Sequence, residues 1–364
     1  MTYTGIFIDD EDLVYAETLS TDNTLKFSIL KITDAASLAK TIFDAKPDIV
    51  ALDYRLDGTP GLSASLSYKG SALAQHLRDM LSEHPDRDFA VVLVSAEQRI
   101  RTLYRPDKTA HDLFDRVYVK EQINKNGAAI RNELISLASA YQSLRNKRGK
   151  YIVSDILGLQ ENEHHYSDRQ DLVNALTDAT LPHVVIRYLL RNIIERNGLL
   201  LDSSAVAARL GVEPSQIDSI LPTLASAGVA YSGLLQSAWP RWWAHRLDEW
   251  ALTTFGRRAT SLTGEDRARQ LSEKLSIELK PATSRWNDSA NELFSFSCAC
   301  CRMPTELRHS LAVFESDLPK FAQRRRLCWD CFQTDRYEDT TPAIQIDESD
   351  KALAIEVKNI NRNK

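Results

Sequence analysis

The stretch Ile6-Phe7-Ile8-Asp9-Asp10-Glu11 decides the fold of the N-terminal region. Its apolar residues predict a short buried strand, here Gly5 to Ile8, and the acids place charge directly at the strand's end. Four more apolar runs of strand length follow, at residues 26–32, 48–52, 89–94 and 116–119. Stretches with helical spacing occupy residues 35–45, 70–82 and 128–144. This alternation predicts the α/β class, with a doubly wound, five-stranded parallel sheet.

The residues that end these predicted strands carry the chemistry of the region. They are Asp9, Asp10 and Glu11 on the first strand, Asp53 on the third, Ser95 on the fourth and Lys120 on the fifth. The carboxyl ends of such strands form the functional crevice of a doubly wound sheet. Crowded carboxylates need a compensating cation, and Mg²⁺ prefers oxygen ligands. We therefore expect Asp9, Asp10 and Asp53 to bind Mg²⁺. Asp53 would be the phosphoacceptor nucleophile, and Ser95 and Lys120 would contact the phosphoryl group.

Four sequence blocks, taken in order, resemble the signature of response-regulator receiver domains of two-component signalling. They are residues 6–11, Ala51-Leu52-Asp53, Leu93-Val94-Ser95-Ala96 and Val117-Tyr118-Val119-Lys120. The resemblance covers about two fifths of the chain. It implies a flavodoxin-like fold, Mg²⁺ binding by the acidic pair and phosphoryl transfer from a histidine kinase to Asp53. It also implies a conformational switch that acts through the Ser95 hydroxyl.

Three features depart from the receiver pattern. Glu121 follows the lysine, where receivers usually have proline. Val117 occupies the aromatic switch position, and Tyr118 is expected on the opposite face of the strand. The stretch from Gly58 to Lys69 is longer than usual. These departures keep open a pseudo-receiver, which has the fold but acts as a phosphorylation-independent scaffold.

All five cysteines lie between residues 298 and 331, in two closely spaced groups. This clustering is typical of a metal site rather than a disulfide framework. The predicted ligands are Cys298, Cys301, Cys328 and Cys331, with Cys300 outside the set and His309 as an alternative ligand. Four thiolates predict structural Zn²⁺, with iron as the alternative metal.

Changes in composition suggest the domain organisation. We expect a receiver domain at 1–145, a polar linker at 146–170, a mainly helical domain at 171–275, a four-cysteine zinc-binding module at 286–335 and a tail at 336–364. Within the helical domain, Ser204–Leu210 and Pro214–Ala225 have helix-turn-helix spacing, and Val229–Leu235 reads as a strand, which together suggest a winged helix. The tail is expected to form two strands or to be loose.

The charge distribution contains features that argue for and against the binding of nucleic acid. The chain has a formal net charge of −5 and a pI of about 6.0, so bulk electrostatics do not favour a polyanion. The second predicted helix, 214–225, has no basic residue. The run Arg324–Arg326 could instead hold a nucleic acid or an acidic partner. The tryptophan-rich segment Trp239–Trp250 is interpreted as core or as a protein interface.

No apolar run of membrane-spanning length and no signal-peptide pattern occurs, so we expect a cytoplasmic protein without membrane contact. We also see no effector-enzyme motif, so the expected chemistry is limited to phosphorylation and dephosphorylation at Asp53. The leading hypothesis is a phosphorelay response regulator whose partners are a histidine kinase and a downstream protein. The alternatives are a DNA-binding transcriptional regulator and a scaffold whose receiver only forms a homodimer.

Overall fold

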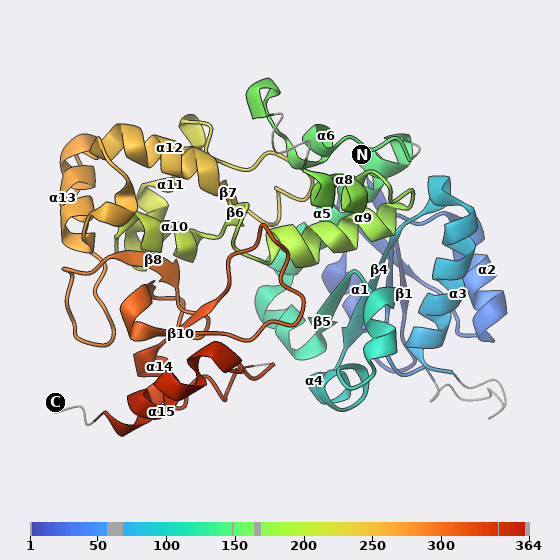
Figure 1. Ribbon diagram of the computed structural model, residues 1–364. Coiled ribbons are helices and arrows are strands. Elements are labelled where there is room, and N and C mark those ends of the chain that lie inside the picture. Colours follow the sequence, from blue (N-terminus) through green and yellow to red (C-terminus); the bar gives the residue numbers. More distant parts are fainter. Residues whose placement is uncertain (1, 57–67, 148, 164–168, 341, 361–364) are drawn as a thin grey trace. The chain divides into compact units, whose positions relative to one another are not determined.

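The computed structural model describes residues 2–56, 68–147, 149–163, 169–340 and 342–360. The chain divides into two compact units (Figure 1). Unit 1 consists of Met1–Leu189 together with Ser232–Trp239, and unit 2 consists of Leu190–Tyr231 and Pro240–Lys364. Each unit is described by itself below.

Unit 1 is built on the predicted five-stranded sheet. Its strands are β1 (Tyr3–Ile8), β2 (Leu25–Ile29), β3 (Ile49–Leu52), β4 (Ala90–Ser95) and β5 (Arg116–Val119). All pairings are parallel, and the strand order is β2-β1-β3-β4-β5. The order reverses between β1 and β3, which creates the crevice at their carboxyl ends that the sequence predicted.

The helices that accompany these strands include two that begin at the predicted residues, 35 and 70, and two that had not been predicted, at residues 14 and 97. They are α1 (Val14–Leu19), α2 (Ala35–Ala45), α3 (Gly70–Glu83), α4 (Glu97–Arg99, continued by a π-helix at Ile100–Tyr104) and α5 (Lys120–Lys147). Asp34 caps α2 by accepting a hydrogen bond from the Ser37 backbone at 2.9 Å. Helix α5 begins earlier than predicted, because Lys120 directly continues β5 into the helix, with a break at Asn126.

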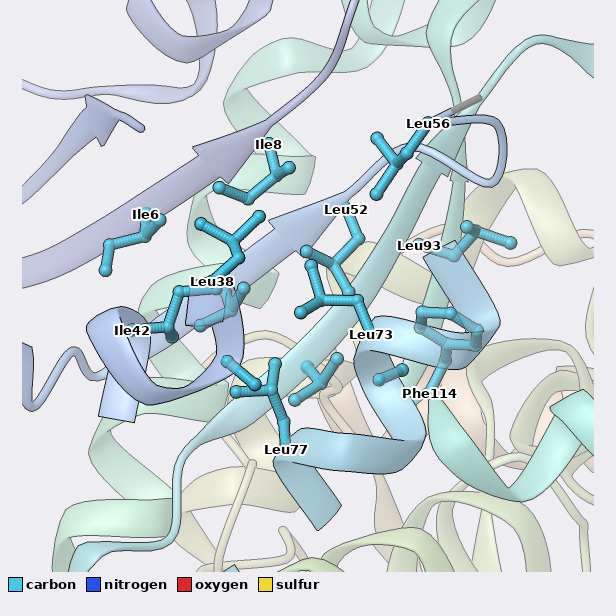
Figure 2. Packing of buried hydrophobic residues seen from close by; sticks show 14 of the residues in the cluster. Ile6, Ile8, Leu38, Ile42, Leu52, Leu56, Leu73, Leu77, Leu93 and Phe114 are labelled. Atoms are coloured by element: carbon cyan, nitrogen blue, oxygen red, sulfur yellow. The ribbon is translucent and has the colours of Figure 1, made fainter. Parts of the chain in front are cut away.

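The core of unit 1 lies between the sheet and helices α2 and α3 (Figure 2). The labelled side chains from the strands are Ile6, Ile8, Leu52 and Leu93, and those from the two helices are Leu38, Ile42, Leu73 and Leu77. All four residues of β3 are fully buried. A strand buried on both faces reads as a continuous apolar run, which is why the sequence revealed it.

Gly70 brings the start of α3 against the end of β3. Its backbone amide donates to the Tyr54 carbonyl at 2.8 Å. A side-chain carbon at this position would overlap the carbonyl oxygen of Asp53. Glycine is therefore required for the close approach that fixes the backbone of Asp53.

The rest of unit 1 is helical, with α6 (Val153–Leu157), α8 (Gln170–Leu176) and α9 (Pro182–Tyr188). Helix α6 lies within the stretch expected to be a linker and buries Val153, Ile156 and Leu157. Buried Arg78 on α3 contacts Asp88 at 3.4 Å and Asp115 at 3.0 Å. Asp88 also accepts from the backbone amide of His183 at 2.8 Å. This ionic network joins α9 to the sheet and helices of the N-terminal α/β region.

The segment Ser232–Trp239 belongs to unit 1, although its flanking residues belong to unit 2. Asn132 of α5 donates to the Ser237 carbonyl at 2.9 Å. The Ser237 hydroxyl donates to Ser136 at 2.9 Å. The guanidinium of Arg116 lies 5.5 Å from the centre of the Trp239 ring. The segment is thereby tied to β5 and α5.

The strand predicted at Val229–Leu235 is not formed. Only Ala230 makes an isolated bridge, to Trp242. The Leu234 amide instead donates to the Ile156 carbonyl at 2.9 Å. The start of the stretch does pair with residues 241–243, since the Trp243 amide donates to the Val229 carbonyl at 2.9 Å and the Tyr231 amide to the Arg241 carbonyl at 2.8 Å. The prediction of one continuous strand was wrong because the backbone at Leu234 bonds to α6 instead.

Unit 2 starts as a helical region. Its elements are a π-helix continuing to Ile194, β6 (Leu200–Leu201), α10 (Ser203–Leu210), a 3₁₀ turn (Pro214–Ser219), α11 (Leu221–Ser226), β7 (Trp242–Trp243), α12 (Ala244–Phe255) and α13 (Gly264–Leu275). The second helix predicted at 214–225 is split in two, because Pro222 has no amide hydrogen to continue it. Trp242 and Trp243 of unit 2 are buried, as is Trp239 of unit 1, which agrees with the core interpretation of the tryptophans.

The cysteine region contains two small antiparallel pairs. They are β8 (Phe294–Ser297) with β9 (Pro304–Glu306), and β10 (Ser310–Ala312) with β11 (Arg326–Cys328), followed by α14 (Trp329–Gln333). The tail forms helix α15 (Lys351–Asn359) instead of a second strand or a loose end. Its Ala354 and Val357, one helical turn apart, pack against the cluster around the cysteines. None of the helices in the described residues combines the length and apolar character needed to cross a membrane.

Candidate functional site

The predicted acidic site assembles at the carboxyl edge of the sheet. Asp9 and Asp10 follow β1, and Asp53 follows β3. One carboxylate oxygen from each of these residues lies within 4.8 Å of the others. Asp9 and Asp53 are buried, whereas Asp10 is partly exposed. The parallel strands thus bring together acids that are more than 40 positions apart in the sequence.

Asp53 is fully buried and contacts Ser95 and Lys120, the two residues predicted to bind the phosphoryl group. Its Oδ1 accepts hydrogen bonds from the Ser95 hydroxyl and, at 2.7 Å, from the Tyr54 amide. Its Oδ2 lies 3.5 Å from Lys120 Nζ. Burial raises the pKa of Asp53 above its usual range, against the opposing effects of the Ser95 hydrogen bond and the Lys120 charge. Both Ser95 and Lys120 are therefore within reach of a group attached to Asp53.

Lys120 bridges the acidic cluster. Its Nζ lies 2.6 Å from Asp9 Oδ2 and 2.9 Å from Asp12 Oδ2. Burial by itself lowers the pKa of Lys120, but the hydrogen bond to Asp9 and the charge of Asp53 outweigh it and raise the pKa. The side chain is therefore a charged ammonium at neutral pH. The contact with Asp12 was not part of the sequence prediction.

Arg99 on α4 is a site residue that the sequence interpretation missed. Its guanidinium donates to Asp53 Oδ2 at 2.8 Å and to Glu11 Oε2 at 2.6 Å. These contacts, led by the Glu11 hydrogen bond, raise the pKa of Arg99 against the effect of burial. A signal was available, because Arg99 stands four residues after Ser95. A helix beginning directly after β4 would carry it back toward the strand ends.

Glu121, which replaces the usual proline, has a definite structural role. Its carboxylate accepts a hydrogen bond from the Glu97 amide at 3.0 Å. It therefore caps the start of α4, the helix that carries Arg99. Tyr118 points away from the site, as expected, and donates to Glu133 of α5 at 3.0 Å. Most of the long stretch 58–69 lies outside the described residues.

The composition of this site suits a hard divalent cation. Five carboxylates, from Asp9, Asp10, Glu11, Asp12 and Asp53, accompany the two cations Lys120 and Arg99. The formal charge of the group is therefore −3. Oxygen donors with excess negative charge are the ligands that Mg²⁺ prefers. The residues present are consistent with a Mg²⁺ site that uses Asp9, Asp10 and Asp53.

The second predicted site lies in unit 2. Sulfur atoms of Cys298, Cys301, Cys328 and Cys331 all lie within 4.8 Å of one another. The pKa of Cys298 is lowered by hydrogen bonds from the neighbouring thiols, with Cys301 first. The Cys328 amide donates to the Cys298 sulfur at 3.3 Å, and the Cys331 amide donates to the Cys328 sulfur at 3.4 Å. Four converging thiols are consistent with Zn²⁺.

Cys300 and His309 lie outside this cluster. The Cys300 thiol is not among the four converging sulfurs. The His309 Nδ1 lies 2.6 Å from Glu306 Oε1, so its ring is engaged by a buried carboxylate. The alternative in which His309 is a ligand is therefore not supported.

Comparison with known proteins adds distant structural likenesses. No protein-family model matches the sequence, and neither does any curated protein. A LuxR-family two-component response regulator from Aurantimonas sp. SI85-9A1 is 16% identical over 36% of this chain and 86% of its own, with a TM-score of 0.26. The signal receiver domain of NarL from Mycobacterium tuberculosis is 22% identical over 38% of this chain and 97% of its own, with a TM-score of 0.25.

NtrX from Brucella abortus is 20% identical over 45% of this chain but only 33% of its own length, with a TM-score of 0.28. Two features of the structure itself characterise the N-terminal region. One is the strand order β2-β1-β3-β4-β5, and the other is the cluster of Asp9, Asp10 and Asp53 at the carboxyl edge of the sheet. The N-terminal α/β region of this chain is receiver-like.

Proposed function

We propose that unit 1 accepts a phosphoryl group on Asp53 from a phosphohistidine kinase in a Mg²⁺-dependent reaction. The observation that carries the proposal is the position of Asp53, which is buried between Ser95, Lys120 and the acidic pair Asp9 and Asp10. In this proposal the only chemistry of the chain is phosphorylation and dephosphorylation at Asp53.

In the proposed transfer, a carboxylate oxygen of Asp53 attacks the phosphorus atom of the phosphohistidine. The phosphorus–nitrogen bond breaks, and the donor imidazole leaves and takes up a proton. Mg²⁺ at Asp9, Asp10 and Asp53 would neutralise charge on the phosphoryl oxygens. The Lys120 ammonium and the Ser95 hydroxyl would then bind the other phosphoryl oxygens.

Hydrogen bonds between the helix that follows the site and a segment that continues into unit 2 support a relay. Lys120 is the first residue of α5, and the same helix carries Asn132 and Ser136. Both residues contact Ser237 in the segment 232–239, whose two ends continue into unit 2. We propose that a movement of Lys120 toward a phosphoryl group shifts α5 and this segment. Unit 2 would then change how it engages a downstream protein partner.

Arg99 favours a second candidate, a phosphorylation-independent scaffold. Its guanidinium provides a cation 2.8 Å from Asp53 Oδ2. A pseudo-receiver could use this ion pair to fix its fold and to present a constant surface. The transcription-factor alternative has less support, because residues 214–226, which include the split second helix, contain no arginine or lysine.

The two candidates differ in their response to beryllofluoride, a non-covalent mimic of an aspartyl phosphate. With Mg²⁺ present, ¹⁹F NMR of the full chain should show protein-bound fluoride signals. They should disappear in Asp53→Asn and persist in Asp44→Asn, which changes an exposed acid on α2. If the native chain gives no bound signal, the scaffold is supported instead.

A further inference from the structure

Unit 2 contains a cavity of about 470 Å³ whose lining is rich in arginine. The lining arginines are Arg191, Arg196, Arg302, Arg324, Arg325 and Arg326. Three carboxylates also line the cavity, so its formal charge is +3, whereas the whole chain carries −5. The volume lies within the range of small-molecule sites. A local positive cavity on an acidic chain indicates an anionic ligand.

In the ion pairs of this cavity the arginine side chain is more exposed to solvent than its carboxylate partner. The Arg325 side chain is 50% exposed, while its partner Glu315, at 3.2 Å, is 7% exposed. Arg302 is 54% exposed and its partner Asp202 is 17% exposed. In each pair the carboxylate lies beneath and orients the guanidinium. Because arginine has five N–H donors, one ion pair leaves donors on each guanidinium that a ligand could use.

The same arrangement extends to the neighbouring arginines. Arg324 is 46% exposed and pairs at 3.0 Å with Asp347, which is 15% exposed and does not line the cavity. The Arg326 guanidinium lies 3.5 Å from Asp350, which is 21% exposed and also does not line the cavity. With Asp347 and Asp350 counted, six arginines accompany five acids, and the formal charge is +1. The remaining positive charge favours an anionic ligand.

One aromatic side chain, Phe296 of β8, lines the cavity. The Arg326 guanidinium lies 5.8 Å from the centre of the Phe296 ring. An aromatic face can stack with a nucleobase, while guanidinium groups pair with phosphate oxygens in a bidentate way. A volume of about 470 Å³ suits one nucleotide better than a continuous strand.

We propose that this cavity binds the polyphosphate of a nucleotide, with Arg302, Arg324 and Arg325 on the phosphates and Phe296 beside the base. Nothing in the proposed phosphorylation of Asp53 requires this site. The inference rests on the charge, exposure and composition of the cavity alone.

The test is isothermal titration calorimetry of the full chain with three probes: ATP, inorganic tripolyphosphate and a single-stranded DNA 12-mer. ATP should bind, and its affinity should fall about tenfold or more in Arg324→Gln and in Arg302→Gln. Phe296→Ala should weaken the binding of ATP and leave the affinity for tripolyphosphate unchanged. Arg258→Gln is the matched control, because this exposed arginine lines a second cavity with two arginines and two acids.

Thermal unfolding and metal content of each variant establish that it is folded. The proposal is overturned if none of the phosphorylated probes binds at low salt. It is also overturned if ATP binds folded Arg324→Gln and Arg302→Gln as tightly as the native chain. Binding of the 12-mer without binding of ATP would likewise contradict it, and would assign the cavity to nucleic acid.

Discussion

The Nη1 atom of Arg99 lies 2.8 Å from Oδ2 of Asp53, the proposed phosphoacceptor. The same guanidinium contacts Glu11 at 2.6 Å. Arg99 thus supplies positive charge at the place where the acidic cluster would hold a divalent cation. The function of unit 1 depends on which cation neutralises Asp53.

Replacing Arg99 with alanine should strengthen Mg²⁺ binding. The change removes one positive charge from a site whose formal charge is −3, and it frees the Oδ2 atom of Asp53. We expect an affinity gain of roughly tenfold from the removed Coulomb repulsion. Calorimetric Mg²⁺ titration of the native and Arg99→Ala chains measures it. Unchanged or weaker binding would mean that Arg99 does not compete with the ion.

Replacing Lys120 with methionine should destabilise unit 1 in the absence of metal. Buried Asp9 and Asp53 would then lose a shared cation, which costs about 3 kcal/mol in the free energy of unfolding. Urea unfolding at pH 7 gives this value, and added Mg²⁺ should recover part of the loss. Lys125→Met, on an exposed position of the same helix, should leave stability nearly unchanged. Equal stability of the two variants would argue against the bridging role.

The strands of unit 1 could be predicted because their burial makes them continuous apolar runs. Ile49–Leu52 is fully buried, and Asp53 follows it directly. Parallel pairing then determines which strand ends meet, so Asp9, Ser95 and Lys120 could be assigned to one edge. The four-cysteine cluster could also be predicted from the sequence, because each of its two cysteine pairs is separated by only two residues.

Other features depend on contacts that leave only a weak local pattern. Arg99 was missed because α4 has only three residues and no apolar periodicity. Residues 229–235 have strand-like composition, but the Leu234 amide bonds to α6. Helix α15 was not anticipated, because its buried Ala354 and Val357 give too short a helical pattern. In each case a distant partner in the sequence decides the local structure.

The four-thiol cluster should bind one Zn²⁺ per chain. Elemental analysis of the purified native chain should show this ratio, and Cys331→Ser should lose the metal because three thiols remain. Cys300→Ser is the matched control and should keep the metal, since Cys300 lies outside the cluster. Loss of zinc in Cys300→Ser, or its retention in Cys331→Ser, would contradict the ligand set.

Beryllofluoride with Mg²⁺ should change amide hydrogen exchange in residues 232–239. The expected cause is a shift of Lys120 and α5 that alters the hydrogen bond from Asn132 to Ser237. Asn132→Ala should reduce the change, whereas Lys125→Ala should not, because Lys125 is exposed on α5. If exchange in this segment is identical with and without beryllofluoride, the proposed relay does not pass through it.

The most direct test of the central claim is intact-mass spectrometry after incubation with a small-molecule phosphodonor. With Mg²⁺, the native chain should gain the mass of one phosphoryl group, and chelation of the metal should prevent the gain. Asp53→Asn should gain nothing, while Asp44→Asn should behave like the native chain. An unmodified native chain, or an equal gain in Asp53→Asn, would contradict the assignment of Asp53 as the phosphoacceptor.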